Sequence, residues 1–323
     1  MKNVLVIGQI HASAQQMLAA ATDIKAHMIT DPGASVPAEQ INQADAILIR
    51  YGVLTEADLA DTPNLKLVSR HGVGCDNLPV SSLSERGIPV TIVGPVNAVS
   101  VAEQTIAMLL ALSKQIGQYD AAVRNGNWNI RDTLAVREIA NKKVLLLGLG
   151  RIGREVARRL QAFDMQIMAF DPFVSEQEAQ DLGVTKVHDW HEVLGEVDVL
   201  SIHLPFTAKT QNIIDAEVFN TIKPSAIILN AARGGLIDEE ALCHALGNRM
   251  KSGGAGIDTF ASEPVPTDSP LLNLPNLLTS PHSAALSEEA AQRMGEVAVQ
   301  NIIDGFNDQL KPELIFNRQG LSK

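Results

Sequence analysis

Residues Lys142–Leu160 read KKVLLLGLGRIGREVARRL, and this stretch decides the fold. A continuous apolar run is followed at once by three glycines in the spacing G-x-G-x-x-G, and then by a pattern with helical periodicity. The stretch therefore predicts a buried strand, a tight glycine turn and a helix, which together open a doubly wound α/β sheet. Because it begins at residue 142 of 323, we expect another domain before it.

The three glycines, Gly148, Gly150 and Gly153, predict a dinucleotide site when they are taken with Asp171. Glycines let the backbone approach a pyrophosphate at the positive end of the helix. Asp171 ends the next apolar run, where a carboxylate can hold ribose hydroxyls and repel a 2′-phosphate, so NAD is expected rather than NADP. This context disfavours the alternative, a glycine turn that only packs helix on strand. The other residues expected at the cofactor are Arg151, Ile152, Leu204, Pro205 and Ala231.

Short apolar runs alternate with helical patterns along most of the chain. The runs of the first block are residues 3–8, 45–50, 65–70 and 88–93, and those of the second block are 143–148, 166–171, 197–204, 226–232, 255–260 and 276–280. Apolar strands separated by helices indicate parallel sheets covered on both faces. We therefore expect the α/β class, with two doubly wound parallel-sheet domains, a flavodoxin-like substrate domain and a Rossmann NAD domain, around a cleft.

A long helical pattern over residues 100–126 separates the two blocks. Ser100 and Glu103 predict a capping box at its start, and Ser287 predicts a second capping box before a final helix. Because this final helix follows the second sheet, we expect it to return to the first domain.

The predicted division of the chain follows from that return. Residues 1–98 plus 287–323 form the discontinuous substrate-binding domain, and residues 99–286 form the dinucleotide-binding domain. Two helices would then cross between the domains, as in a hinge around a cleft.

The composition is that of an ordinary globular protein, with 46% hydrophobic and 20% charged residues. The formal net charge of −11 argues against nucleic acid as a partner, so a bound anion would rely on local arginines. The longest apolar runs, such as Ile106–Leu112, are far shorter than the ~20 residues of a membrane-spanning helix. The N-terminus is typical of a buried strand rather than a signal peptide. We therefore expect a cytoplasmic protein without a membrane partner, whose Cys75 and Cys243 stay reduced.

Three side chains with complementary chemistry, Arg233, Glu263 and His282, each follow an apolar run of the second block. The carboxyl ends of parallel strands meet at one edge of a sheet, where ligands bind. Arg233 would bind a carboxylate, His282 would exchange a proton with a hydroxyl, and Glu263 would fix the imidazole tautomer. Each residue also has a non-catalytic interpretation. Arg233 could cap a strand end, Glu263 could be a solvated loop acid, and His282 could be a loop histidine with ordinary hydrogen-bond partners. Together they indicate oxidation of an alcohol.

Other motifs are weaker candidates for a functional site. A second G-x-G, in Ser69–Asn77, lacks a third glycine and is interpreted as a loop whose amides bind an anion. His188 and His191 lack a third ligand nearby, so a helix start is preferred to a metal site, and no metal is expected. His203 is expected to be structural or to line the cofactor site.

Six blocks of this sequence resemble the D-isomer-specific 2-hydroxyacid dehydrogenases, with the phosphoglycerate dehydrogenases as the nearest branch. The blocks are GLGRIG, FDP at Asp171, IHLPFTAKT, NAARGGLIDEEAL, GIDTFASEP and SPHSAA. Their order makes the resemblance specific, and it covers nearly the whole chain. One departure is the SAA after His282, where many relatives have glycines.

The resemblance implies roles for particular residues. Arg233, Glu263 and His282 are the expected catalytic residues of an NAD-dependent D-2-hydroxyacid dehydrogenase. Asp258 is expected to contact the nicotinamide carboxamide, and residues 100–140 are expected to form the contact of a homodimer. The length also leads us to expect a short form without a C-terminal regulatory domain.

The resemblance bears on the substrate as well. Arg50 and Arg70 end runs of the first block and, with the amides around Val73 and Gly74, offer more positive charge than one carboxylate requires. We therefore expect a second anionic group on the substrate, as in 3-phosphoglycerate, with Arg131 of the dimer segment as a further contact that comes from the partner subunit. The alternatives are two surface arginines, a hydroxypyruvate/glyoxylate reductase, a formate dehydrogenase, and an NAD-sensing corepressor. The arginines argue against formate, and the intact catalytic set argues against a corepressor.

Overall fold

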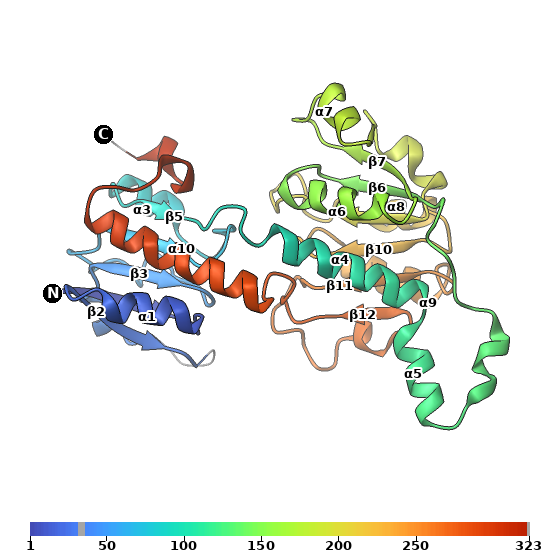
Figure 1. Cartoon of the computed structure of the whole chain (residues 1–323), viewed down its shortest axis with the longest axis horizontal. Helices are drawn as coiled ribbons and strands as arrows, with labels where there is room; N and C mark the ends of the chain where they lie inside the picture. The colour runs from blue at the N-terminus through green and yellow to red at the C-terminus, as the bar shows by residue number, and fades with distance from the viewer. Residues whose placement is uncertain (32–35, 322–323) are drawn as a thin grey trace. The chain divides into compact units, whose positions relative to one another are not determined.

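The computed structural model describes residues 1–31 and 36–321, which form two compact units (Figure 1). Unit 1 comprises Met1–Asn97 with Leu286–Lys323, and unit 2 comprises Ala98–Ala285. Each unit contains one parallel sheet with helices, so the predicted α/β class is confirmed. Within the described residues, no helix combines the length and the apolar character that crossing a membrane requires.

Unit 1 is a flavodoxin-like domain on a five-stranded parallel sheet with the order β2-β1-β3-β4-β5. Its strands are β1 (Lys2–Ile7), β2 (Ile24–Ile29), β3 (Ala46–Ile49), β4 (Leu67–Arg70) and β5 (Val90–Thr91). Its helices are α1 (Ala12–Ala20), α2 (Ala38–Asn42), α3 (Val80–Glu85) and α10 (Glu288–Phe306), with the 3-10 turns η4 (Pro312–Leu314) and η5 (Arg318–Gly320). β2 is an edge strand in which only Ile24 is buried, so no apolar run predicted it.

The last long helix, α10, packs on the sheet of unit 1 beside α1 (Figure 1). The hydroxyl of Ser69 on β4 donates to the carbonyl oxygen of Ala298 on α10 at 2.8 Å. A Cβ built at Gly295 would lie 2.9 Å from the Cβ of Ala14 on α1. A glycine at this position therefore lets the two helices approach closely.

Unit 2 has a seven-stranded parallel sheet with the order β12-β11-β10-β9-β6-β7-β8. Its strands are β6 (Lys143–Leu147), β7 (Gln166–Phe170), β8 (Thr185–Lys186), β9 (Val199–Ile202), β10 (Ile227–Asn230), β11 (Gly254–Ile257) and β12 (Leu277–Thr279). Its helices are α4 (Ala98–Ser113), α5 (Ile116–Arg124), α6 (Arg151–Gln161), α7 (Glu176–Asp181), α8 (Ala216–Thr221) and α9 (Glu239–Gly247), with the 3-10 turns η1 (Trp128–Thr133), η2 (His191–Glu196) and η3 (Pro270–Asn273). The strand order runs outward from β6 and β9, so the topological switch point, where such sheets bind ligands, lies between these two strands.

Three predicted details of the helices are wrong. The long helix predicted between the two blocks is two helices, α4 and α5, because Gln115 takes a left-handed conformation with φ of 50°. Ser100 lies inside α4 and donates its hydroxyl to the carbonyl oxygen of Ala284 at 2.6 Å, rather than capping the helix. Ser287 does cap α10, but no capping box forms because Ala290 occupies the position that an acid or amide would need.

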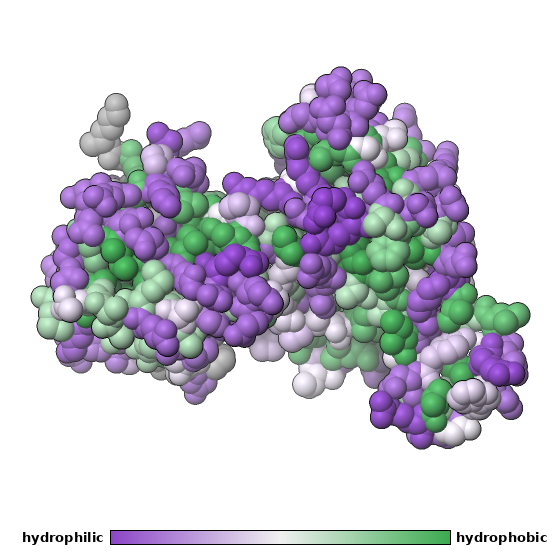
Figure 2. All heavy atoms as spheres, viewed as in Figure 1, coloured by the Kyte–Doolittle hydropathy of each residue, from purple (hydrophilic) through white to green (hydrophobic). Residues whose placement is uncertain are grey.

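The segment from residue 116 to residue 136 exposes apolar side chains, and we call it the 116–136 surface. Its exposed large apolar residues are Ile116, Val123, Trp128, Leu134 and Val136. Trp128 is 64% exposed and Leu134 is 84% exposed. Figure 2 shows hydrophobic residues, in green, among polar ones on this segment at the lower right. Exposed apolar side chains gathered on one segment are typical of an interaction surface.

His71, which directly follows β4, is a buried histidine of unit 1. It is 5% exposed, and neither ring nitrogen has a hydrogen-bond partner among the described residues. Burial, together with the charges of Arg50 and Arg70, lowers the pKa of His71 to about 4. The folded protein therefore keeps this imidazole neutral under conditions in which the unfolded chain protonates it.

We predict that His71 makes the folded state sensitive to acid. The ordinary pKa of histidine is about 6.5, so above that pH the imidazole is neutral in both states. As the pH falls towards the folded pKa of about 4, only the unfolded state binds the proton. The free energy of unfolding then decreases by at most about 1.4 kcal/mol per pH unit. Urea unfolding at several pH values should show a smaller decrease for His71→Asn than for the wild type, and equal decreases would contradict this prediction.

Candidate active site

The glycine turn after β6 has the geometry of a ligand-binding loop. Gly148 has φ of 97°, in the left-handed region, and a Cβ there would lie 2.8 Å from the carbonyl oxygen of His203. A Cβ at Gly153, in α6, would lie 2.3 Å from the carbonyl oxygen of Gly148. Gly150, the N-cap of α6, would instead hold its Cβ in open space. Two glycines therefore serve the turn and the helix packing, whereas Gly150 leaves the backbone open to a ligand.

Asp171 lies beside this turn, directly after β7. Its Oδ2 accepts the N–H of Leu149 at 2.9 Å, and its Oδ1 accepts the N–H of Phe173 at 2.9 Å. Each carboxylate oxygen has two lone pairs, so both can accept a further hydrogen bond. The carboxylate is thus fixed next to the amides of the turn, as the binding of ribose hydroxyls would require.

The other residues predicted at the cofactor lie beyond the ends of adjacent strands. Arg151 and Ile152 form the first turn of α6, which follows β6, and Arg151 is exposed. Leu204 and Pro205 follow β9, and Ala231 follows β10 and is buried. β6, β9 and β10 are neighbours and run parallel, so these residues gather at the carboxyl edge of the sheet.

The loop that carries Arg233 is held by a buried asparagine. Asn230, the last residue of β10, is 1% exposed. Its Nδ2 donates to the carbonyl oxygen of Arg233 at 2.8 Å, and its Oδ1 accepts the N–H of Ala232 at 3.1 Å. The Arg233 guanidinium donates from Nη1 to the carbonyl oxygen of Ala232 at 2.7 Å. Asn230 was missed in the sequence because an asparagine at a strand end has no distinctive pattern around it.

Glu263 and His282 form a hydrogen-bonded pair. Oε2 of Glu263 lies 2.8 Å from Nδ1 of His282, and Oε1 accepts the N–H of Phe260 at 2.9 Å. Burial opposes the charged carboxylate, but these two hydrogen bonds and the charge of Arg233 outweigh it and lower the pKa of Glu263 below its ordinary value. The carboxylate therefore accepts, Nδ1 carries the proton, and Nε2 is left as a proton acceptor.

The loop that carries His282 is organised by Asp258, which is 1% exposed. Oδ1 of Asp258 accepts from the hydroxyl of Ser280 at 2.5 Å and from the N–H of Ser283 at 2.9 Å, while Oδ2 accepts from the N–H of Ala284 at 3.0 Å. The carbonyl oxygen of Asp258 accepts the N–H of His282 at 2.8 Å. Oδ2 keeps one lone pair without a donor among these groups, and its contact with a nicotinamide carboxamide stays a prediction.

The arginines predicted at the substrate lie in unit 1, at the ends of β3 and β4. Arg50 donates from Nη1 to the carbonyl oxygen of Gln9 at 2.5 Å. Arg70 donates to the carbonyl oxygens of Gly74 at 2.9 Å and Ile49 at 3.1 Å. The guanidinium of Arg70 thus holds the loop that contains Val73 and Gly74 through a hydrogen bond.

The three further histidines considered in the sequence analysis, His188, His191 and His203, have local partners. His188 and His191 are exposed, and each lies within hydrogen-bond distance of a neighbouring carboxylate, at 2.9 and 2.8 Å. Nε2 of His203 lies 2.9 Å from the hydroxyl of Ser201. Burial lowers the pKa of His203 to about 4, so its imidazole beside the glycine turn is neutral.

Comparison with known proteins decides the family. The family model described as D-isomer specific 2-hydroxyacid dehydrogenase, NAD binding domain, matches residues 106–284, more than half of the chain. The chain belongs to the D-isomer specific 2-hydroxyacid dehydrogenase family. The predicted resemblance is therefore confirmed, and the matched region of unit 2 is the family's NAD-binding domain.

Members of this family are similar along most of the chain. A D-3-phosphoglycerate dehydrogenase from Mycobacterium bovis is 40% identical over 85% of this chain, but the chain spans only about half, 52%, of that relative. A glyoxylate reductase from Korarchaeum cryptofilum is 33% identical over 88% of this chain and 86% of the relative. The crystal structure of D-lactate dehydrogenase from Aquifex aeolicus, complexed with NAD and lactic acid, matches with a TM-score of 0.86 and 28% identity over 95% of this chain and 96% of that one.

We predict that two glycine variants of the family's NAD-binding turn separate folding from binding. Gly150→Ala places its methyl group in open space, so stability should hold while NAD affinity falls about tenfold or more. Gly153→Ala places its methyl group 2.3 Å from the carbonyl oxygen of Gly148, so the protein should lose about 1–3 kcal/mol of stability. Thermal unfolding and calorimetric titration with NAD measure both effects. Unchanged NAD affinity in a folded Gly150→Ala protein would contradict the assignment of the turn.

Proposed function

We propose that the protein is an NAD-dependent D-2-hydroxyacid dehydrogenase. The observation that carries the proposal is the 2.8 Å pair of Glu263 and His282, in the same unit as Arg233, Asp171 and the glycine turn. A proton acceptor beside a cation and a dinucleotide site is the set that oxidation of a 2-hydroxy acid needs. Membership of the family supports the same activity.

The chemistry divides among three side chains. When bound, NAD supplies the acceptor for the hydride that leaves C2 of the hydroxy acid. Arg233 binds the substrate carboxylate and polarises the oxygen on C2. Nε2 of His282 takes the hydroxyl proton in oxidation and returns it in reduction. Glu263 accepts the Nδ1–H bond and stabilises the positive charge that the imidazole gains with the proton.

The test of this activity is His282→Gln, assayed by nicotinamide absorbance with a panel of 2-hydroxy and 2-keto acids. Loss of proton transfer should lower kcat by about 10²–10⁴-fold while NAD still binds. Because the pKa of Glu263 is lowered, its carboxylate stays charged until the pH falls below the ordinary glutamate range. Glu263→Gln lacks that charge at every pH, so its pH profile should differ from the wild type with a smaller loss of kcat. Full turnover by His282→Gln would overturn the assignment.

We infer further that the substrate carries a second anionic group, as 3-phosphoglycerate does. Arg50 directly follows β3 and Arg70 ends β4, and ligands of parallel sheets bind beyond such ends. The two arginines place positive charge at neighbouring strand ends, although the whole protein has a net charge of −11. The relative from Mycobacterium bovis, named D-3-phosphoglycerate dehydrogenase, supports this substrate class.

The alternative substrate class is that of a hydroxypyruvate or glyoxylate reductase, which two observations favour. Arg70 already donates to the carbonyl oxygens of Gly74 and Ile49, so its charge serves the fold of unit 1. The relative named glyoxylate reductase also matches along 86% of its own length. Both observations suit a small substrate without a second anionic group.

Arg50→Ala separates the two substrate classes. A charge-assisted contact contributes ~1.5–3 kcal/mol, so this variant should lower kcat/KM for 3-phosphoglycerate by roughly one to two orders of magnitude and leave D-glycerate nearly unchanged. Arg70→Ala should lower both, because the loop of unit 1 loses its brace. The control is Arg318→Ala, an exposed arginine of the same unit. An equal loss of kcat/KM for both substrates in Arg50→Ala, or a wild type that prefers glyoxylate, would favour the hydroxypyruvate or glyoxylate reductase instead.

We propose that residues 100–140 form the contact of a homodimer. The 116–136 surface lies within this segment, and its Trp128 and Leu134 are well exposed. Arg131, also exposed, belongs to the same surface, and in the dimer Arg131 of the partner subunit would add a third cation to the substrate site. Analytical ultracentrifugation of the wild type and of Trp128→Ser with Leu134→Ser tests the contact, and a monomeric wild type would refute it.

A cytoplasmic location is part of the same proposal. Cys75 and Cys243 form no disulfide, and reduced thiols are usual in a reducing compartment. Cell fractionation with antibodies against the native protein tests the location, and recovery outside the cytoplasm would contradict it.

A further inference from the structure

Two loops of the candidate active site touch through their backbones. Gly234 directly follows Arg233, and a Cβ at Gly234 would lie 1.8 Å from the carbonyl oxygen of Phe260. Phe260 in turn donates its N–H to Glu263 at 2.9 Å. The positions of Arg233 and Glu263 are therefore coupled, and whatever fixes the second loop also affects the first.

One side chain outside the proposed catalytic set holds that second loop. Glu239, the first residue of α9, accepts the N–H of Ala261 at 2.6 Å on its Oε1. Ala261 lies two residues before Glu263. The two neighbouring acids do not contact this loop in the same way. Asp238, the N-cap of α9, accepts the N–H of Ala241, and Glu240 is exposed.

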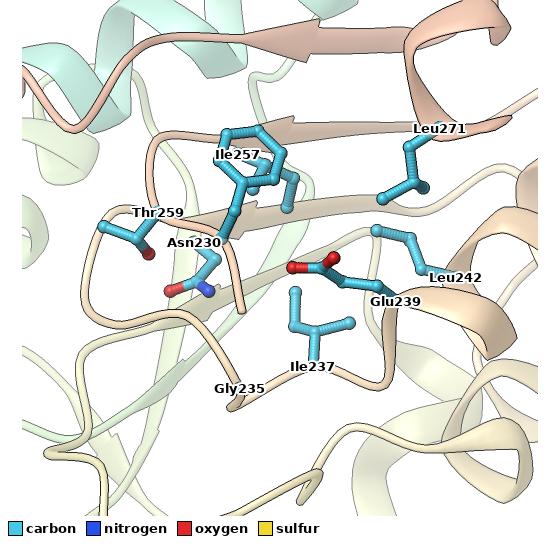
Figure 3. A pocket seen from close by; sticks show the side chains of 9 residues that line it. Asn230, Gly235, Ile237, Glu239, Leu242, Ile257, Thr259 and Leu271 are labelled. Carbon is cyan, nitrogen blue, oxygen red and sulfur yellow. The ribbon is translucent and has the colours of Figure 1, made fainter. Parts of the chain in front are cut away.

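Glu239 reaches the loop beside a small cavity. Figure 3 shows its carboxylate pointing among the side chains of Asn230, Ile237 and Thr259, which line a cavity of about 10 Å³. Ile237 and Thr259 are buried, whereas Glu239 is half-buried and Ala261 is exposed, so the hydrogen bond lies at the rim of this cavity. The positive end of the α9 dipole also favours a negative charge at this first helical position.

We propose that Glu239 is a positioning residue for Glu263. It fixes the N–H of Ala261 and thereby the loop, so that Glu263 presents one oxygen to the N–H of Phe260 and the other to Nδ1 of His282. Three hydrogen bonds thus lead from α9 to the imidazole. The inference rests on the proposed function, but its structural core, the tautomer of His282, can be measured without turnover.

The direct test is the ring N–H signal of His282 in protein labelled with 15N-histidine, assigned by its disappearance in His282→Gln. In the wild type the proton should lie on Nδ1, shifted downfield by the carboxylate. Glu239→Ala should weaken that shift and mix the two tautomers, whereas Glu239→Gln, which keeps an acceptor oxygen, should retain most of it. The control is Glu240→Ala, which removes an exposed acid one residue along the same helix.

Steady-state kinetics supply the second readout. Misplacing Glu263 should lower kcat about tenfold to a hundredfold in Glu239→Ala, with partial rescue in Glu239→Gln and with NAD affinity changed less than about threefold. A wild-type ring signal and wild-type kcat in Glu239→Ala would overturn the proposal, even if its melting temperature falls. Should Glu239→Ala not fold, Glu239→Gln supplies the test: loss of the Nδ1–H signal in this variant, which keeps the acceptor oxygen for the N–H of Ala261, would overturn the proposal.

The two readouts also separate this inference from the proposed function. If the wild type oxidises no hydroxy acid, the proposed activity fails while the ring signal still reports on Glu239. If the wild type turns over and the signal ignores Glu239, only the positioning role fails.

Discussion

The candidate active site depends on one buried carboxylate, that of Asp258. At 1% exposure this group would be costly to bury without partners, and the loop that follows β12 supplies them from Ser280, Ser283 and Ala284. These donors are satisfied together only when the loop takes one path. On that path His282 adopts φ of 50°, a conformation that residues other than glycine seldom take. The sheet, through Asp258, therefore sets the place of the imidazole.

The same arrangement recurs on the neighbouring strand. Asn230 and Asp258 lie side by side at the ends of β10 and β11, where the N–H of Asp258 donates to the carbonyl oxygen of Asn230 at 2.9 Å. Each is buried, and each uses its side chain to hold a loop that carries a proposed catalytic residue, Arg233 in one case and His282 in the other. Precision in the loops thus comes from two polar residues in the rigid part of the domain.

Much of this could be predicted from the sequence, for physical reasons. Strands such as β9 and β10 are buried throughout, so each appears in the sequence as a continuous apolar run. Ligands of parallel sheets bind where such strands end, which points to the site residues. The edge strands β2 and β8 have no apolar run, and the break at Gln115 leaves no mark because the residue is not a glycine. The supporting roles of Asn230 and Glu239 depend on partners far along the chain or across a turn, which no local pattern reveals.

The backbone contact at Gly234 bears on how such a protein can change over evolutionary time. Since a methyl group there would overlap the carbonyl of Phe260, almost any replacement forces both loops to move at once. A single substitution at Gly234, next to Arg233, is therefore excluded as a step towards a new substrate. Change is then confined to positions at which a single replacement leaves both loops in place.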